Sequence, residues 1–202
     1  MTSGKKIVIL PKPRLNGKVS LEETLNKRRS IRNYSGKFIS LNVLSQLLWA
    51  GWGITAMDGK RTSPSAGGLF PVELYVLVGC VTDVEAGVYK YHQENNTLTL
   101  TISGDKRDEL ANAALGQECL LNCAAAIIIA ADISKTARKY GDRAERYVFM
   151  EAGHISQNIH LQATAMDLGT VAVGAFFDDQ VKSVLKLPAN LQPLYIMPVG
   201  IP

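Results

Sequence analysis

The sequence predicts an α+β fold, because helical and strand-like segments are mixed without a regular strand–helix–strand alternation. The segment from about Arg146 to Asp167 has apolar residues at helical spacing and is the longest helix expected. Leu74–Val78 and Ala124–Ala131 are apolar runs of strand length, which is typical of buried strands. A chain of 202 residues suits a single domain, expected over residues 20–202 after an arm over residues 1–19.

Capping residues and periodicity place the remaining elements. Ser20, with a glutamate three residues later, forms a capping box that predicts a helix to about Arg29. Ser40 can cap a second helix through Ala50. Further along, the sequence predicts an irregular loop over residues 51–71, a β-hairpin formed by Gly87–Tyr91 and Thr97–Ile102, and a helix at Asp105–Ala114. The last two strands are expected at Thr170–Val173 and Leu194–Val199, separated by a helix that Asp178 can cap. A short extended segment is expected at Ile7–Leu10.

The charge and the cysteines favour a cytoplasmic protein that binds a small anion rather than nucleic acid. The net charge of +4 is mild, and the densest basic run, residues 27–32, is short and local. Cys80, Cys119 and Cys123 lie in or beside apolar stretches and lack metal-ligand spacing. We therefore expect buried free thiols in a reducing cytosol and no metal site. Because no apolar run is long enough to cross a bilayer, no membrane association is expected either.

Two segments in the first half of the chain are suited to binding an anionic ligand. The run Arg28–Arg32 supplies guanidinium groups, which bind phosphate through forked donors. Alternatively, these cations complement the dipole at a helix C-terminus. In Ser63–Pro71, small residues let backbone amides approach a flat or charged ligand closely. This segment is neither a Walker loop nor a nucleophile elbow, and an ordinary loop is the alternative interpretation.

The long helix carries more polar residues than a buried helix usually does. The segment 139–147 leads into Glu151, His154, Gln157 and Asn158. Since polar groups on an apolar helix are usually paired, a helix–helix interface is the first interpretation, and a catalytic role for Glu151 or His154 is the second. His154 and His160 lie on different helix faces, so we do not expect them to share a metal ion.

A fourth segment ends the strand that begins at Thr170. Gly174 and Ala175 precede the helix expected at Asp178, where backbone N–H groups are free. Such donors could stabilise a ligand atom that gains electrons. The chain has no Gly-x-Gly-x-x-Gly fingerprint, so a nicotinamide donor would have no dinucleotide-binding domain of its own.

Five motifs, taken together and in this order, resemble the nitroreductase superfamily, and most closely its branch of SagB-type dehydrogenases. They are Arg-Arg-Ser-x-Arg from Arg28, Pro-Ser-Ala-Gly-x-x-x-Pro-x-Glu-x-Tyr from Pro64, Lys-Tyr-Gly-x-Arg from Lys139, Glu-x-Gly-His-x-x-Gln-Asn from Glu151 and Val-Gly-Ala-Phe from Val173. The resemblance covers about Ser20 to Pro202. It implies a homodimer with a mostly antiparallel mixed sheet flanked by helices, a long central dimer helix, and FMN bound between the subunits.

By this resemblance, the residues that bind FMN come from both subunits. Arg28, Arg29 and Ser30 would hold the phosphate and the ribityl chain. Arg32 would face the pyrimidine edge of the flavin, where a cation favours the reduced, anionic ring. Pro64, Ser65, Ala66 and Gly68 would come from the partner subunit. Gln117 would offer its amide to the ring, and Gly174 and Ala175 would donate backbone N–H groups near the flavin N5.

The sequence departs from many relatives at two places. Those relatives carry basic residues and an embracing arm after the last strand, whereas here the last strand is followed by Gly200-Ile201-Pro202. The second phosphate-binding cation is therefore unassigned, and Ile7–Leu10 is a candidate for the arm. Many relatives also have an acidic residue near the flavin N5, where this chain has Gly174.

The resemblance implies an oxidoreductase in which NAD(P)H and a small acceptor, such as a nitroaromatic or a quinone, react in turn at one FMN by a ping-pong hydride mechanism. Two alternatives stay open. One is a SagB-type dehydrogenase that oxidises azoline rings of a modified peptide, in which Lys139 and Tyr140 would be catalytic. For this pair, a solvated lysine and a packed tyrosine are an equally good interpretation. The other alternative is a flavin-binding or flavin-storage protein without turnover.

Overall fold

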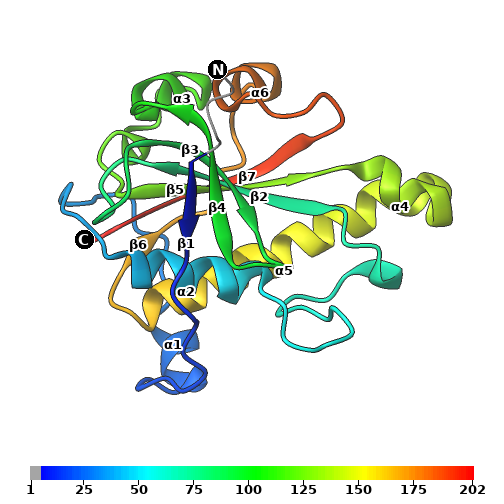
Figure 1. Cartoon of the computed structure of the whole chain (residues 1–202), viewed down its shortest axis with the longest axis horizontal. Coiled ribbons are helices and arrows are strands. Elements are labelled where there is room, and N and C mark those ends of the chain that lie inside the picture. The colour runs from blue at the N-terminus through cyan, green and yellow to red at the C-terminus, as the bar shows by residue number, and fades with distance from the viewer. Residues whose placement is uncertain (1–5) are drawn as a thin grey trace.

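Seven strands form one sheet in the order β1-β4-β3-β2-β5-β7-β6 (Figure 1). The computed structural model describes residues 6–202, so the first five residues of the predicted arm lie outside the described part. The strands are β1 Ile7–Ile9, β2 Val72–Val78, β3 Gly87–His92, β4 Thr97–Ser103, β5 Ala125–Ala131, β6 Gly169–Thr170 and β7 Gln192–Gly200. Neighbouring strands are antiparallel throughout the described chain, and a parallel contact occurs at the isolated bridge between Ile39 and Val81. The predicted α+β class is confirmed.

Helices cover both faces of this sheet. They are α1 Leu21–Lys27, α2 Leu41–Trp52, α3 Arg107–Ala113, α4 Ile133–Tyr140, α5 Ala144–Thr164 and α6 Asp178–Leu185, with 3-10 turns η1 Ala66–Gly68, η2 Glu118–Leu120 and η3 Gly141–Arg143. Because successive strand residues point to opposite faces, β2 contributes to two cores. Leu74 and Val76 pack with α2 and α5, whereas Tyr75 and Leu77 pack with α3 and α6.

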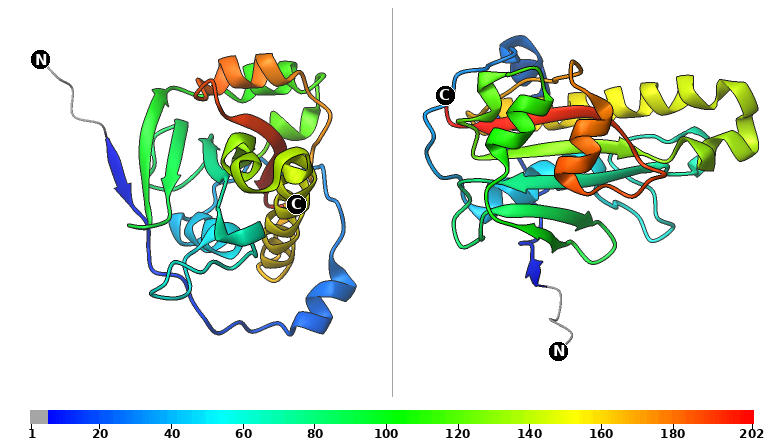
Figure 2. Two further views of the ribbon diagram at one scale, coloured as in Figure 1. Left: turned by 90° about the vertical axis from the view of Figure 1, so that its right-hand side faces the viewer. Right: turned by 90° about the horizontal axis from the view of Figure 1, so that it is seen from above.

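The long helix α5 lies along one face of the sheet and organises the candidate site. Its predicted apolar stripe is buried from Val148 to Ala163, whereas Met166 lies beyond its end. Figure 2 shows α4 and the first turns of α5 reaching past the end of the sheet. There Phe149 is 46% and Met150 54% exposed, so this part of α5 presents apolar side chains to solvent in a single chain. No helix in the described part of the chain is long and apolar enough to cross a membrane.

Both serine caps are confirmed, since Ser20 accepts from the Glu23 N–H and Ser40 from the Val43 N–H. The predicted hairpin is also present as β3 and β4. The capping role predicted for Asp178 is wrong, because Phe177 is the N-cap and Asp178 is the first helical residue. Thr170–Val173 is not a continuous strand. Pairing breaks after Thr170 and returns as a single bridge between Val173 and Ile196.

Ile7–Ile9 pairs with β4 of its own chain and forms the outer strand of the sheet. The chain then runs along α2, to which three hydrogen bonds hold it. The Ser45 hydroxyl donates to the Pro11 carbonyl at 2.6 Å, and the Gln46 side chain accepts from the Arg14 N–H and donates to the Arg14 carbonyl. Within one chain, the segment predicted to be extended therefore completes the sheet edge.

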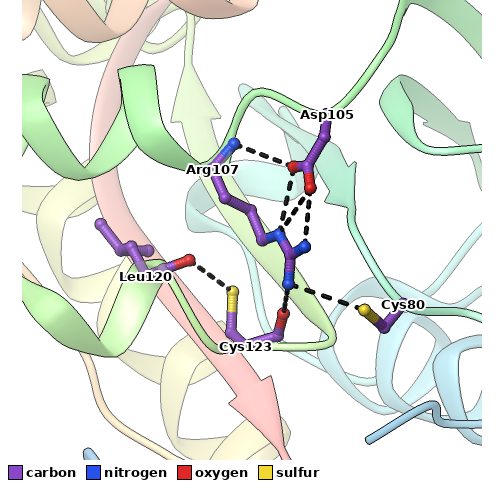
Figure 3. Close-up of polar contacts among 5 residues, drawn as sticks. All are labelled: Cys80, Asp105, Arg107, Leu120 and Cys123. Carbon is purple, nitrogen blue, oxygen red and sulfur yellow. Dashed lines mark hydrogen bonds and ion pairs between the residues drawn. The ribbon is translucent and has the colours of Figure 1, made fainter. Parts of the chain in front are cut away.

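Arg107, the first residue of α3, ties this helix to the turn before β5 (Figure 3). Its guanidinium pairs with Asp105 at 2.6 Å and donates to the Cys123 carbonyl at 2.9 Å. A Cβ at residue 79 would lie 2.5 Å from Arg107 Nε, so Gly79 is needed for this close approach. Burial raises the pKa of Cys123 to about 12, which keeps it a neutral thiol. All three cysteines are free as expected, but Cys80 is half-buried rather than buried.

Candidate active site

The predicted phosphate-binding segment follows α1 directly. Arg28 is the C-cap of α1, and the Ile31 N–H donates to the Thr170 carbonyl of β6 at 3.0 Å, which fixes the segment against the sheet. Arg28 is half-buried, and Arg29, Ser30 and Arg32 are exposed. Within residues 6–202, no carboxylate pairs with these arginines. Their charge is therefore available to an external anion.

Two buried polar atoms beside this segment have no hydrogen-bond partner within the described residues. They are Nδ1 of His160, which is 5% exposed on α5, and Oγ1 of Thr170, which is 1% exposed. Burial and the nearby charge of Arg28 lower the pKa of His160, so the imidazole is neutral near pH 7. Because an unpaired buried polar group is costly, these atoms mark a place where hydrogen-bonding capacity is unused.

Gln117 contacts the Gly174–Ala175 segment, and both belong to the set of residues predicted to bind the cofactor. The Gln117 side-chain amide donates to the Ala175 carbonyl at 3.1 Å. The charge of Arg32 acts on Cys119, two residues beyond Gln117, although burial raises the pKa of that thiol overall. Gly174 and Ala175 are exposed, and their N–H groups have no acceptor in the part of the chain described. The structure thus brings together one half of the residues predicted to bind the cofactor.

A cavity of about 380 Å³ borders Gly174. Its walls include three aromatic residues from separate elements, namely Phe149 of α5, Phe176 after β6 and Tyr195 of β7. Such a wall suits a flat apolar ligand.

The other predicted half is the turn Ser65–Gly68, which we call the glycine turn. Gly67 and Gly68 have φ of 63° and 66°, a left-handed conformation that glycine adopts without strain. The Ser65 hydroxyl accepts from the Phe70 N–H at 2.9 Å and closes the turn. A Cβ on Gly68 would meet no atom within 4 Å, so the backbone there is open to a ligand.

Lys139 and Tyr140 lie against the glycine turn. A Cβ on Gly67 would lie 2.7 Å from Tyr140 Oη and 2.9 Å from Lys139 Nζ, so the polar ends of both side chains reach the turn. The Tyr140 ring also packs edge-on against Tyr147 of α5, with ring centroids 5.0 Å apart. The packing interpretation of Tyr140 is therefore confirmed, and the position of its hydroxyl leaves a catalytic role open.

Two ionisable residues, Glu151 and Arg61, lie near the glycine turn, and the sequence analysis named only Glu151. Glu151 of α5 is 2% exposed, and burial raises its pKa to about 7, against opposing effects of Ser65, the Ala66 N–H and Arg61. Arg61 lies between the rings of Trp52 and Phe70, 4.4 Å from each ring centroid. Sequence analysis missed Arg61, because no local pattern links it to Trp52 at the end of α2 and to Phe70 in the loop, each nine positions away. His154 is exposed and makes no side-chain hydrogen bond or ion pair with the residues that the structure describes.

The two halves lie on opposite sides of α5. Helix residues two positions apart point in directions that differ by about 200°. Glu151 faces the glycine turn, whereas Phe149 faces the Gly174 cavity. In the same way Asn158 bonds Thr62 and Ser63, whereas His160 lies beside Arg28. One chain therefore holds both sets of predicted ligands but keeps them apart.

Comparisons with known proteins show which family the chain belongs to. The Nitroreductase family profile matches residues 25–201. A nitroreductase homologue of Methanocaldococcus jannaschii is 45% identical over 182 residues, which cover 90% of this chain and 91% of that protein. A solved nitroreductase homologue from Anabaena variabilis has a TM-score of 0.81 and 36% identity over 90% of this chain, which spans 38% of that longer chain. The NADPH:FMN oxidoreductase of Vibrio harveyi, solved with NAD+, has a TM-score of 0.64 and 25% identity over 90% of this chain and 68% of its own. The chain belongs to the nitroreductase family of oxidoreductases.

Proposed function

We propose that this protein is a homodimeric, FMN-dependent oxidoreductase that uses NAD(P)H to reduce small acceptors such as nitroaromatics or quinones. The observation that carries the proposal is the separation of two ligand-binding halves by α5. A second copy is needed to place a glycine turn opposite the residues Arg28–Arg32. The solvent-exposed Phe149 and Met150 on α5 support such a contact, because apolar helix faces are usually covered.

The residues present fit the phosphate of FMN. Among residues 6–202, Arg28 has no competing carboxylate, and the atoms of His160 and Thr170 that have no partner there lie beside the segment Arg28 begins. A phosphate needs charged and neutral donors together, because its oxygens accept several hydrogen bonds. In this proposal Arg28, Arg29 and Ser30 bind the phosphate and ribityl chain.

The residues near Gly174 fit the ring. Bound FMN supplies the isoalloxazine that takes a hydride from the donor and passes two electrons to the acceptor. The free N–H groups of Gly174 and Ala175 orient the ring edge, and the Gln117 amide fixes the segment that carries them. From the second copy, Pro64, Ser65, Ala66 and Gly68 close over the ring and exclude water. The aromatic cavity beside Gly174 leaves room for donor and acceptor in turn.

Turnover by the purified, FMN-loaded protein tests this proposal. We expect oxidation of NADH or NADPH that depends on a quinone or nitroaromatic, with parallel double-reciprocal plots typical of a ping-pong mechanism. The Vibrio harveyi relative, solved with NAD+, supports a nicotinamide donor. Tight FMN binding without oxidation of either nucleotide would favour the flavin-storage alternative instead.

Azoline oxidation in a modified peptide is the second candidate function, and the position of Lys139 and Tyr140 favours it. Both polar ends contact the glycine turn, which the proposal places beside the flavin. A lysine there could take a ring proton while hydride leaves the azoline for the flavin. If this reaction is the physiological one, Lys139→Met should lose azoline oxidation by a factor of about 100 or more but keep quinone reduction. Equal effects on both reactions would assign Lys139 a structural role.

Arg32 offers a test of the ring's orientation. Arg32→Gln is expected to lower the flavin midpoint potential, because a cation at the pyrimidine edge stabilises charge that appears only on reduction. For a two-electron couple, a shift of about 30 mV corresponds to about 1.4 kcal/mol. The control is Arg28→Ala at saturating FMN, whose potential should be nearly unchanged, since a phosphate contact acts equally on both redox states. Potentiometric titrations that give equal shifts would reject separate roles for the two arginines.

A further inference from the structure

Phe70, two residues after the glycine turn, has a left-handed backbone conformation. Its φ is 47°, a value that a bulky aromatic residue rarely adopts because its Cβ is crowded there. The Phe70 N–H donates to the Ser65 hydroxyl at 2.9 Å and so closes the turn. Because rotation about φ moves this N–H relative to the Phe70 side chain, the position of the ring and the closure of the turn depend on each other. A strained conformation of this kind persists only where neighbouring groups hold it.

Arg61 packs on the Phe70 ring. Its guanidinium carbon lies 4.4 Å from the ring centroid of Phe70 and 4.4 Å from that of Trp52, and the two rings contact each other edge-on. Trp52 is the last residue of α2, is fully buried, and donates from its indole N–H to the Val72 carbonyl at 3.0 Å. A cation over the face of an aromatic ring is attracted to it. Arg61 therefore joins the Phe70 ring to a fixed indole.

The backbone of Arg61 is itself fastened to the end of α2. Arg61 and Ile54 form an isolated antiparallel bridge, and the Thr62 N–H donates to the Gly53 carbonyl at 2.9 Å. Asn158 of α5 also donates to the Thr62 carbonyl, at 3.1 Å. The contact on Phe70 thus comes from a segment that is hydrogen-bonded to two helices, so it restrains residues farther along the same loop.

The guanidinium of Arg61 has no polar partner within residues 6–202. Its Nε and Nη1 atoms are buried there without a hydrogen-bond acceptor, and no carboxylate forms an ion pair with it. A buried N–H without an acceptor weakens the fold, and an apolar side chain of similar length would fill the same space without that cost. Arg61 therefore departs from what stability alone favours, and such departures are typical of functional sites.

We infer that Arg61 is a positioning residue, which holds the Phe70 ring beside Trp52, keeps Phe70 in its left-handed conformation and thereby sets the glycine turn for the flavin of the partner subunit. The place of the turn at the flavin rests on the proposed function. The hold on Phe70 rests on contacts within one chain.

The test compares Arg61→Met with Arg61→Lys in the full-length protein. Hydrogen exchange at the Phe70 amide, measured by NMR, reports on its bond to Ser65, flavin fluorescence reports on FMN affinity, and thermal melting reports on the fold. We expect Arg61→Met to speed exchange at Phe70 and to weaken FMN binding about tenfold, because binding must then restore the strained conformation. The melting temperature should be nearly unchanged, since the lost contact is offset by released strain and by removal of the unpaired N–H groups.

Two further variants serve as controls. Arg61→Lys keeps a cation over the rings and should retain more of the exchange protection and of the FMN affinity than Arg61→Met does. Lys60→Met removes the neighbouring cation, which is exposed and pairs with Asp58, and should change none of the three measurements.

Phe70→Gly shows whether Arg61 acts through Phe70. Glycine adopts a φ of 47° without strain and has no ring for Arg61 to hold. In this background Arg61→Met should therefore change FMN affinity by less than about twofold, so the two substitutions are not additive. If Arg61→Met weakens FMN binding by the same factor in both backgrounds, the inference is overturned.

The outcomes also separate this inference from the proposed function. Unchanged exchange at Phe70 in Arg61→Met would overturn the positioning role, as would a lowered melting temperature with normal FMN affinity. Faster exchange with unchanged FMN affinity would support the hold on Phe70 but contradict the place of the glycine turn at the flavin.

Discussion

Replacing Arg28 with alanine is expected to weaken FMN binding by about one to two orders of magnitude. A hydrogen bond to a charged partner contributes about 1.5–3 kcal/mol, and every 1.4 kcal/mol is about tenfold in the dissociation constant. Arg28 is half-buried and has no carboxylate partner in the described chain, so little of its charge is already neutralised. Titration of the flavin-free protein with FMN, followed by flavin fluorescence, measures the change.

Riboflavin is the matched ligand for this variant because it lacks the phosphate. Its affinity should be nearly the same for the wild type and Arg28→Ala. If both ligands lose affinity equally, Arg28 contributes to the fold of the segment rather than to phosphate binding. If FMN is retained as tightly as by the wild type, the phosphate lies elsewhere.

Glu151 is expected to make the free energy of unfolding fall as the pH rises from about 4.5 to 7. Burial raises its pKa from 4.5 to about 7, so the folded protein binds this proton more tightly than the unfolded chain does. The stabilisation by the neutral form is complete below pH 4.5, declines up to pH 7 and is absent above it. A shift of one pKa unit corresponds to about 1.4 kcal/mol, so the loss over this interval is about 3 kcal/mol.

Glu151→Gln removes the titrating group and keeps its shape. Urea denaturation between pH 5 and pH 8 should therefore show a smaller decline for Glu151→Gln than for the wild type. His160 has a lowered pKa and also makes stability depend on pH, but it remains in both proteins, so its contribution cancels in the difference. Parallel curves for the two proteins would mean that Glu151 is already charged at pH 5 in the folded state.

Local signals in the sequence predicted most of the fold. The two serine caps depend on residues three positions apart, and the hairpin depends on two alternating runs around a turn. By contrast, α4 was missed although Asp132 caps it through the Ser134 N–H. Its side chains are mostly polar and it has eight residues, so the apolar residues on one face, Ile133, Ala137 and Tyr140, give a weak periodic signal. The break after Thr170 also has no local sequence signal, because it follows from how β6 and β7 pair.

The candidate site was less accessible to sequence analysis, because its contacts join distant segments. The approach of Lys139 to Gly67 links residues 72 positions apart, and Arg61 lies between rings from α2 and from the loop end. The motifs named the residues that could bind a cofactor. Only the structure shows that α5 separates them into two halves, since that depends on which face of the helix each segment contacts.

The most direct test of a shared FMN site is a mixed dimer of two defective chains. One carries Arg28→Ala, and the other carries Gly68→Val, which strains a residue with φ of 66°. The chains are co-expressed with different tags, the mixed dimer is isolated through both, and tightly bound FMN is counted. If each site combines Arg28 of one copy with the glycine turn of the other, the mixed dimer has one intact site and binds one FMN, while neither parent dimer binds FMN tightly. A mixed dimer that binds no FMN tightly would show that each chain builds its site alone and would contradict the account.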